Sequence, residues 1–308
     1  MTELCLQPSD LFSYQPELII QALAHPLFDQ KGLSVTVVRT DLIHSEVSGN
    51  KWYKLKYNLL QAKTNNQTRL LSFGGAYSNH IHALAWAAGQ LGLVSVGIIR
   101  GEPVSNPMLD DAQRWGMQLH FVDRVQYRQR SDAAWLQKLM AEHEVDVVIP
   151  EGGSNSLALK GVGELMRGIS QQLPGLDYLL CACGTGGTLA GLLSKAPKRV
   201  QLEGYPVLKG GDFLYQEIES LLAGANRSVE CHWSLDLESH YGGYGKVKAD
   251  HKMIWHQLEA DFGVPLDPIY TAKLFRRFME KVAQGDYPEG AKIVLLHSGG
   301  LQGRRSMC

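Results

Sequence analysis

Strand-like and helix-like stretches alternate along most of the chain, and this alternation limits the possible folds more than any other feature. From Leu33 to Tyr205, each short apolar run is followed by a longer run with apolar residues three and four positions apart. Such alternation is typical of α/β proteins, in which helices cover both faces of parallel sheets. The expected strands cover residues 33–39, 69–73, 94–99, 118–122, 145–150, 178–183, 200–205 and 293–296, and the expected helices cover residues 52–63, 79–93, 108–116, 132–144 and 157–173, with another beginning at 189.

Domain boundaries are not marked by composition. The chain has 308 residues, which is enough for two domains or one large one. No Pro/Ser-rich linker, repeat or low-complexity tract divides it. Residues 1–32 predict a helical or irregular lead-in, because Pro16, Pro26 and Gly32 interrupt them.

The composition argues against several classes of protein. A net charge of −1 without long runs of one sign argues against nucleic acid or an anionic membrane as a partner. No apolar stretch approaches the ~18 residues of a membrane span, and the first residues do not resemble a leader, so we expect a cytoplasmic protein. Five scattered cysteines indicate reduced thiols. Cys181 and Cys183 are predicted to pack in the core, and no metal is expected.

Lys51 stands where a charged lysine is unfavourable. The segment SGNK at residues 48–51 ends a polar loop, and the helix expected at residues 52–63 follows directly. The helix dipole disfavours a cation in the first turn. The conflict disappears if the lysine nitrogen forms an imine with an aldehyde cofactor in a desolvated pocket. On these four residues alone, a solvated lysine beside a flexible loop is the better interpretation.

The segment GTGGT at residues 184–188 is the strongest candidate for an anion site. It lies between a buried strand and a helix start, where glycines allow close approach and threonines add hydroxyl donors. Glu203, about 20 residues on, would suit a dinucleotide site, in which an acid binds the ribose. The glycine spacing departs from the dinucleotide pattern, however. We therefore predict a phosphate monoester and keep a nucleotide-binding, nicotinamide-dependent dehydrogenase as an alternative.

A second loop, GGAYSNH at residues 74–80, also leaves a strand and enters a helix. Ser78 or Asn79 is placed as the helix N-cap, and capping accounts for one of them but not for both. At the carboxyl end of a parallel strand, a hydroxyl and an amide lie where ligands of open α/β sheets bind. His80 and His82 diverge on the helix, so they are not predicted as metal ligands, although His80 is in a position to line the site.

The C-terminal part holds three further motifs. They are YGGYG at residues 241–245, DPIYT at 267–271, and HSGG at 297–300, the last after an expected buried strand. Tyrosines between glycines commonly serve turn packing, but they also act as proton donors or carboxylate partners.

In this order, the motifs resemble those of pyridoxal-phosphate enzymes of the tryptophan synthase β type, and most of all the 1-aminocyclopropane-1-carboxylate deaminase and D-cysteine desulfhydrase family. The resemblance covers residues 33–301. It implies two open twisted, mostly parallel sheets, with pyridoxal 5'-phosphate in the cleft between two domains. The smaller domain would be residues 48–160, and the larger would be residues 1–47 plus 161–308. A homodimer is usual for the family.

The resemblance also implies roles for individual residues. Lys51 matches the Schiff-base lysine, and Ser78 matches the serine that holds the substrate carboxylate or acts near the α-carbon. Tyr244 and Tyr270 match a pair of active-site tyrosines. Asn79 matches the amide that binds the pyridine 3-hydroxyl. The cofactor-binding positions that it implies are Lys51, Lys54, Asn79, Gly184, Thr185, Gly186, Gly187, Thr188 and Ser298.

Two positions bear on the substrate, a small amino acid. Ser298 lies where the family faces the pyridine nitrogen, and a hydroxyl there makes the ring a milder electron sink, which suits elimination. Cyclopropane-opening members carry glutamate and leucine where this chain has Thr271 and Ser298. The resemblance therefore implies D-cysteine α,β-elimination to pyruvate, ammonia and sulfide. Deamination of 1-aminocyclopropane-1-carboxylate to 2-oxobutanoate and ammonia, dehydration of serine or threonine, and cofactor binding without turnover are the alternatives.

Overall fold

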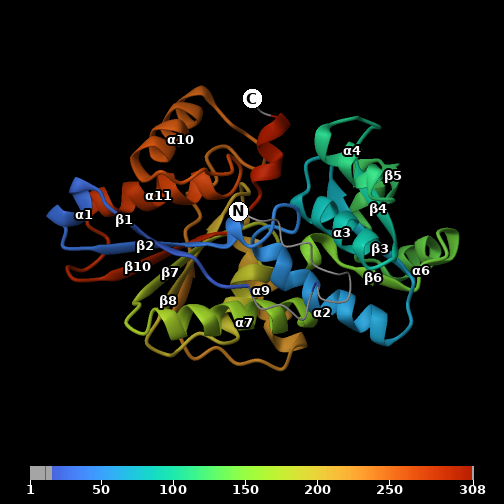
Figure 1. The fold of residues 1–308 in the computed structure, drawn as a ribbon, viewed down its shortest axis with the longest axis horizontal. Coiled ribbons are helices and arrows are strands. Elements are labelled where there is room, and N and C mark those ends of the chain that lie inside the picture. The colour runs from blue at the N-terminus through green and yellow to red at the C-terminus, as the bar shows by residue number, and fades with distance from the viewer. Residues whose placement is uncertain (1–10, 12–15, 307–308) are drawn as a thin grey trace.

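Two sheets organise the structure, a computed structural model that describes residue 11 and residues 16–306 (Figure 1). The larger sheet has the strand order β1-β2-β10-β7-β8-β9, and the smaller has the order β5-β4-β3-β6. All neighbouring strands are parallel except β1 and β2, so the predicted fold class is confirmed. The strands are β1 (Ile20–Leu23), β2 (Ser34–Arg39), β3 (Arg69–Gly75), β4 (Val94–Arg100), β5 (Gln118–Val122), β6 (Val147–Ile149), β7 (Tyr178–Cys183), β8 (Gln201–Pro206), β9 (Trp233–Leu235) and β10 (Lys292–His297).

Helices surround both sheets, and most of them begin close to the positions expected from sequence. Among the described residues, short 3₁₀ helices lie between or after the main elements: η1 (Thr40–Leu42), η2 (Glu151–Gly153), η3 (Gly211–Phe213) and η4 (Leu301–Ser306). The α-helices are α1 (Pro26–Gln30), α2 (Asn50–Thr64), α3 (Asn79–Gln90), α4 (Pro107–Arg114), α5 (Arg124–Arg128), α6 (Ala133–Glu142), α7 (Ser156–Gln172), α8 (Gly187–Leu193), α9 (Leu214–Gly224), α10 (Ala249–Phe262) and α11 (Thr271–Gln284).

The predicted helical or irregular lead-in agrees with helix α1 but is wrong at residues 20–23, which form a strand. Residues 16–32 include the edge strand β1, which pairs antiparallel with β2, as well as α1. The strand has four residues, and only Leu23 among them is buried, so it leaves little pattern in the sequence. The rest of the lead-in, apart from residue 11, lies outside the described residues. The sequence also predicted no element between residues 207 and 290, where the structure places α9, β9, α10 and α11.

Three helices that flank the pocket described below pack closely through glycines. A Cβ on Gly161 of α7 would lie 1.9 Å from the carbonyl oxygen of Tyr53 in α2. A Cβ on Gly191 of α8 would lie 2.4 Å from the Cβ of Val162 in α7. Neither position leaves room for a side chain. Because α2 and α8 both begin at loops that carry candidate site residues, this packing sets the distance between the two loops.

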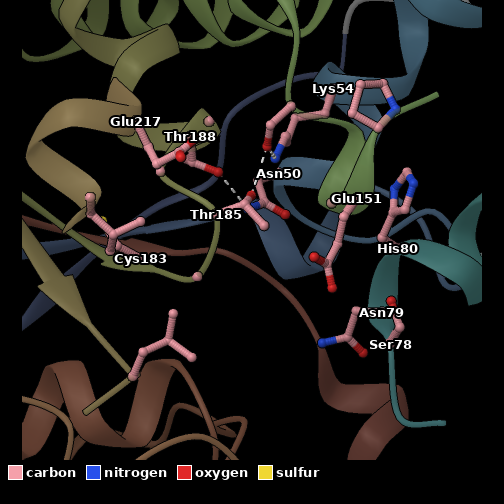
Figure 2. A pocket seen from close by; sticks show the side chains of 18 of the residues that line it. Asn50, Lys54, Ser78, Asn79, His80, Glu151, Cys183, Thr185, Thr188 and Glu217 are labelled. Atoms are coloured by element: carbon pink, nitrogen blue, oxygen red, sulfur yellow. Dashed lines mark hydrogen bonds between the residues drawn. The ribbon is translucent and has the colours of Figure 1, made fainter. Parts of the chain in front are cut away.

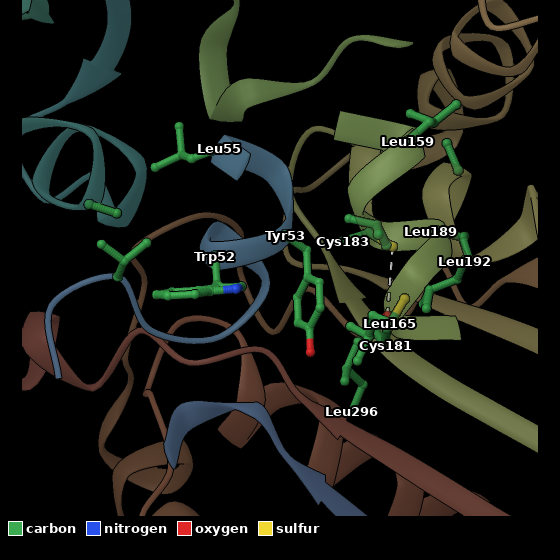
Figure 3. Close-up of a cluster of buried hydrophobic side chains, with 14 of the residues drawn as sticks. Trp52, Tyr53, Leu55, Leu159, Leu165, Cys181, Cys183, Leu189, Leu192 and Leu296 are labelled. Carbon is green, nitrogen blue, oxygen red and sulfur yellow. Dashed lines mark hydrogen bonds between the residues drawn. The ribbon is translucent and has the colours of Figure 1, made fainter. Parts of the chain in front are cut away.

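The core beneath these helices is apolar and includes two cysteines. Cys181 and Cys183 are buried on β7 in one apolar cluster with Leu165 and Leu189, as the packing prediction expected (Figure 3). The cysteines at positions 5 and 308 fall outside the described residues. In the described part of the chain, no helix is long and apolar enough to cross a membrane.

Candidate active site

A pocket of about 440 Å³ opens where strands from both sheets end. Its walls include the loops that follow β3, β6 and β7 and the start of α2, from which Figure 2 labels residues. The loop that follows β10 also lines it, through Ser298 and Gly299. Ligands of open α/β sheets bind at such carboxyl ends. The residues to which the resemblance assigned catalytic or cofactor-binding roles all line this pocket, namely Lys51, Lys54, Ser78, Asn79, Gly184, Thr185, Gly186, Gly187, Thr188, Tyr244, Tyr270 and Ser298.

Lys51 is the second residue of α2, at the helix start as predicted. Its Nζ donates to Oδ1 of Asn50 at 2.8 Å, and Nδ2 of Asn50 donates to Oγ1 of Thr188 at 2.7 Å, a bond drawn in Figure 2. Burial lowers the pKa of Lys51 to about 8, and the nearby charge of Asp267 opposes that shift. At neutral pH the amine is still charged in most molecules, but it loses its proton far more readily than an exposed lysine, which lessens the conflict with the helix dipole.

Acylation of Lys51 should reveal this lowered pKa directly. In the ligand-free protein, the rate of labelling by acetic anhydride is expected to rise with pH and to level off above about pH 8, because the neutral amine is the nucleophile. Exposed Lys63, at the end of the same helix, serves as the control. Peptide mass spectrometry measures both rates. Labelling of Lys51 that keeps rising in parallel with that of Lys63 would contradict the lowered pKa.

The loop of residues 184–188 makes close contacts with two other segments. A Cβ on Gly187 would lie 2.4 Å from Oγ of Ser154 and 3.0 Å from Nζ of Lys54. Gly186 has a φ of 73°, a left-handed conformation that favours glycine. Oγ of Ser154 also lies 2.7 Å from Oγ1 of Thr185. The missing side chains thus let the loop backbone approach a group of hydroxyl and amine donors.

Lys54 is the strongest sign that an anion belongs here. Its side chain is fully buried, and its Nζ donates to Oγ of Ser154 at 2.8 Å. Burial and, next, the charge of Lys51 lower the pKa of Lys54 well below its usual range. No ion pair to Lys54 occurs within the residues that the structure describes. An anionic group between the two lysines would relieve the cost of burying them.

Ser78 is the N-cap of α3, so capping accounts for one member of the Ser78–Asn79 pair, as expected. Its Oγ accepts from the backbone N–H of Ile81 at 3.3 Å while also facing the pocket. Asn79 is not accounted for in this way, because its Oδ1 is buried without a protein partner. Such an orphaned acceptor indicates a donor that the protein itself does not supply. His80 lines the pocket, and its Nε2 lies 2.8 Å from Oγ of Ser72.

The two tyrosines come from separate segments and meet at the pocket. The rings of Tyr244 and Tyr270 are 6.1 Å apart and nearly perpendicular. Burial raises the pKa of each hydroxyl, so both hold their protons at neutral pH. Asp267 lies close by, and its Oδ1 accepts from the backbone N–H groups of Ile269 and Tyr270 at 3.0 and 2.6 Å. Burial raises the pKa of Asp267 to about 7.

Several residues around the site carried no predicted role. Asn50 and Asp267 belong to motifs that the sequence displayed, whereas Ser154 was not singled out. For all three, only the contacts in the structure reveal what they bind. Glu151 and Arg130 are paired at 2.6 Å on the pocket wall, and no sequence signal marked them.

Two other residues of interest lie away from the pocket surface. Thr271 is fully buried, and its Oγ1 accepts from the backbone N–H of Asp267 at 2.6 Å. Glu203, which the dehydrogenase alternative needed, is buried in β8, where it binds Lys281 at 2.7 Å and accepts from Tyr205 and Tyr287. Partners around the larger sheet therefore already supply hydrogen bonds and an opposite charge to the carboxylate of Glu203.

The family comparison agrees with this geometry. Residues 23–299 match the family described as pyridoxal-phosphate dependent enzyme. This chain therefore belongs to the pyridoxal-phosphate dependent enzymes, and its cofactor is pyridoxal phosphate. The dehydrogenase alternative is accordingly wrong.

Individual proteins of this family are similar to the chain over most of its length. A putative 1-aminocyclopropane-1-carboxylate deaminase of Thermotoga maritima is 30% identical, with 90% of this chain and 92% of that protein covered. A bifunctional D-cysteine desulfhydrase/1-aminocyclopropane-1-carboxylate deaminase of Arabidopsis thaliana is 28% identical, with 88% and 73% covered. The solved structure of a homologue of the deaminase superimposes with a TM-score of 0.81 at 25% identity, covering 98% of this chain and 96% of the other.

Proposed function

We propose that this chain is a pyridoxal-phosphate-dependent lyase whose main reaction is α,β-elimination from D-cysteine, giving pyruvate, ammonia and sulfide. The observation that carries the choice of substrate is the pair of hydroxyl residues, Thr271 and Ser298, at the two positions where the family resemblance implies glutamate and leucine in cyclopropane-opening members. Ser298 lines the pocket, and Thr271 fills a fully buried site beside Asp267. Neither position offers a carboxylate to a cyclopropane substrate.

The residues of the pocket fit the cofactor. The phosphate would lie against residues 184–188, where Lys54, Ser154 and Thr185 supply donors. The unpaired Oδ1 of Asn79 would accept from the 3-hydroxyl of the ring. When bound, pyridoxal phosphate withdraws electrons from the α-carbon of an amino acid and so acidifies its α-proton.

The side chains of the pocket would then move protons. Lys51 would take the α-proton on Nζ, because burial has brought its pKa close to neutral. Tyr244 and Tyr270 would keep a proton on each hydroxyl for the departing β-thiolate, since burial raises both pKa values. The substrate carboxylate would lie near Ser78 at the start of α3, where helix N–H groups favour an anion.

Ser78→Ala tests whether this serine does more than cap a helix. We expect kcat/KM to fall about 100-fold, as for a lost positioning contact, and the free energy of unfolding to fall by about 1 kcal/mol, as for a lost N-cap. Asp132→Ala is the matched control, because Asp132 caps α6 through the N–H of Trp135 at 2.8 Å outside the pocket. If both variants lose stability and neither loses activity, capping is the whole role of Ser78.

The substrate proposal is tested by incubating the purified enzyme with D-cysteine, L-cysteine, D- and L-serine, L-threonine and 1-aminocyclopropane-1-carboxylate. The expected result is sulfide and pyruvate from D-cysteine, with the highest kcat/KM of the panel. The second candidate is 1-aminocyclopropane-1-carboxylate deamination, which the names of the Thermotoga and Arabidopsis relatives favour. A dominant yield of 2-oxobutanoate from that substrate would replace the first proposal by the second.

The assembly and location of the enzyme also belong to this proposal. We infer a homodimer in the cytoplasm, on the family resemblance and the cysteine composition, and a division into residues 48–160 and residues 1–47 plus 161–308. The four strands of the smaller sheet fall between residues 69 and 149, which supports that division. Sedimentation of the purified enzyme tests the assembly.

A further inference from the structure

Lys273 is a fully buried lysine that the proposed reaction does not use. It lies in the first turn of α11, and its side chain has no exposed surface. Its Nζ donates to the carbonyl oxygen of His240 at 2.9 Å and to that of Gly243 at 2.8 Å. Within the described part of the chain, Lys273 forms no ion pair; the charge of Asp267 acts on it only from further away. A buried ammonium bonded only to carbonyls is costly, which points to a role in specifying a conformation.

Both carbonyls belong to a segment with unusual backbone geometry. Tyr241, Gly242, Gly243 and Gly245 all have positive φ, at 45°, 99°, 109° and 68°. Left-handed conformations at a non-glycine residue such as Tyr241 cost free energy and persist only when the surroundings hold them. This segment therefore depends on external contacts for its shape.

Lys273 joins the two turns that shape the segment. The N–H of Gly243 donates to the carbonyl of His240 at 3.0 Å, and the N–H of Lys246 donates to the carbonyl of Gly243 at 3.2 Å. These bonds close two successive turns. Lys273 binds the same two carbonyl oxygens, so one ammonium bridges both turns. Tyr244 is a central residue of the second turn.

The same helix also begins at the other tyrosine. Tyr270 is the N-cap of α11, three residues before Lys273. Helix α11 thus carries Tyr270 at its start, and its residue Lys273 binds the turn that contains Tyr244. Further along α11, Glu280 accepts from the hydroxyl of Tyr241 at 2.8 Å, a second contact to the same segment.

We propose that Lys273 is a positioning residue that holds residues 240–246 against α11, so that Tyr244 meets Tyr270 in the pocket. The consequence for catalysis rests on the proposed function, in which these tyrosines act on the substrate. The claim that Lys273 holds the segment against α11 is independent of that function. Lys273 retains its charge in most molecules at neutral pH, because burial lowers its pKa only to about 8.

Two measurements on the holoenzyme test this proposal. In Lys273→Met, amide hydrogen exchange of residues 240–248 is expected to speed up at least about tenfold. The variant lacks the two hydrogen bonds from the ammonium that hold the closed segment, so the segment opens more often. The value of kcat/KM is expected to fall between about 10-fold and 100-fold, as for a displaced catalytic group. In a Tyr244→Phe background, the same substitution should change kcat/KM less than about twofold, because residues that act as a unit are not additive.

Lys281→Met is the matched control. Lys281 lies on the same helix but binds Glu203 at 2.7 Å rather than the segment, so this variant should lose stability without faster exchange at residues 240–248. Unchanged exchange in Lys273→Met, or an equal loss of kcat/KM in both backgrounds, would overturn the proposal. Full activity of Tyr244→Phe alone would instead overturn the proposed role of Tyr244, and the exchange measurement would still decide whether Lys273 holds the turns.

Discussion

Lys51→Ala is expected to lower turnover at least about 1,000-fold, because one substitution removes both the amine proposed to hold the cofactor and the proposed base for the α-proton. The fold should persist. Alanine is favourable in a helix, and burying an amine costs free energy, so the free energy of unfolding should stay the same or rise. Steady-state kinetics and thermal melting measure the two effects.

The control for Lys51→Ala is Lys63→Ala, at the exposed end of the same helix, which should match the wild type in both measurements. Borohydride reduction of the wild-type holoenzyme, followed by peptide mapping, should place the cofactor on Lys51. Wild-type turnover in Lys51→Ala, or a label on Lys54 instead, would show that another lysine serves the reaction.

Gly49→Ala should damage both the stability and the site. Gly49 has a φ of 66° and a ψ of −140°, a region that is essentially restricted to glycine, and a Cβ there would lie 2.0 Å from the backbone oxygen of Ser298. Backbone strain and overlap together should cost roughly 3 kcal/mol or more. Because Gly49 directly precedes Asn50 and Lys51, displacement by ~1 Å should also lower kcat/KM about 100-fold.

Gly92→Ala is the control for a positive φ without steric overlap. Gly92 has the same φ of 66°, but a Cβ there would meet nothing within 4 Å. Gly92→Ala should lower the free energy of unfolding by about 1 kcal/mol and leave kcat/KM unchanged. Urea unfolding and steady-state kinetics measure both variants. Equal losses in the two would mean that the contact between Gly49 and Ser298 is not the cause.

The sequence was informative wherever its signal is local or ordered along the chain. Strands such as β3, β4 and β7 are buried on both faces, so they appear as continuous apolar runs. The loops after β3 and β7 display their glycines and polar residues directly. The order of the motifs predicted both the family and the residues that line the pocket.

Elements with weaker patterns escaped prediction. Strand β9 has three residues and pairs only with β8, so almost no periodicity marks it. In α10 only His251, Trp255, Leu258 and Phe262 are buried, and its remaining surface is mixed in polarity. These elements are defined by what they pack against, and that information is not local.

The sequence by itself determined the fold class, the family and the residues that face one pocket, because strand periodicity, glycine loops and motif order are properties of the chain as written. Only the tertiary structure decided the chemical state of those residues. The pKa of Lys51 falls and that of Asp267 rises because distant segments exclude water from both. Lys273 looks like an ordinary helix residue until the fold brings the carbonyls of His240 and Gly243 to its ammonium. Desolvation and long-range hydrogen bonds arise when the chain packs, and no local pattern records them.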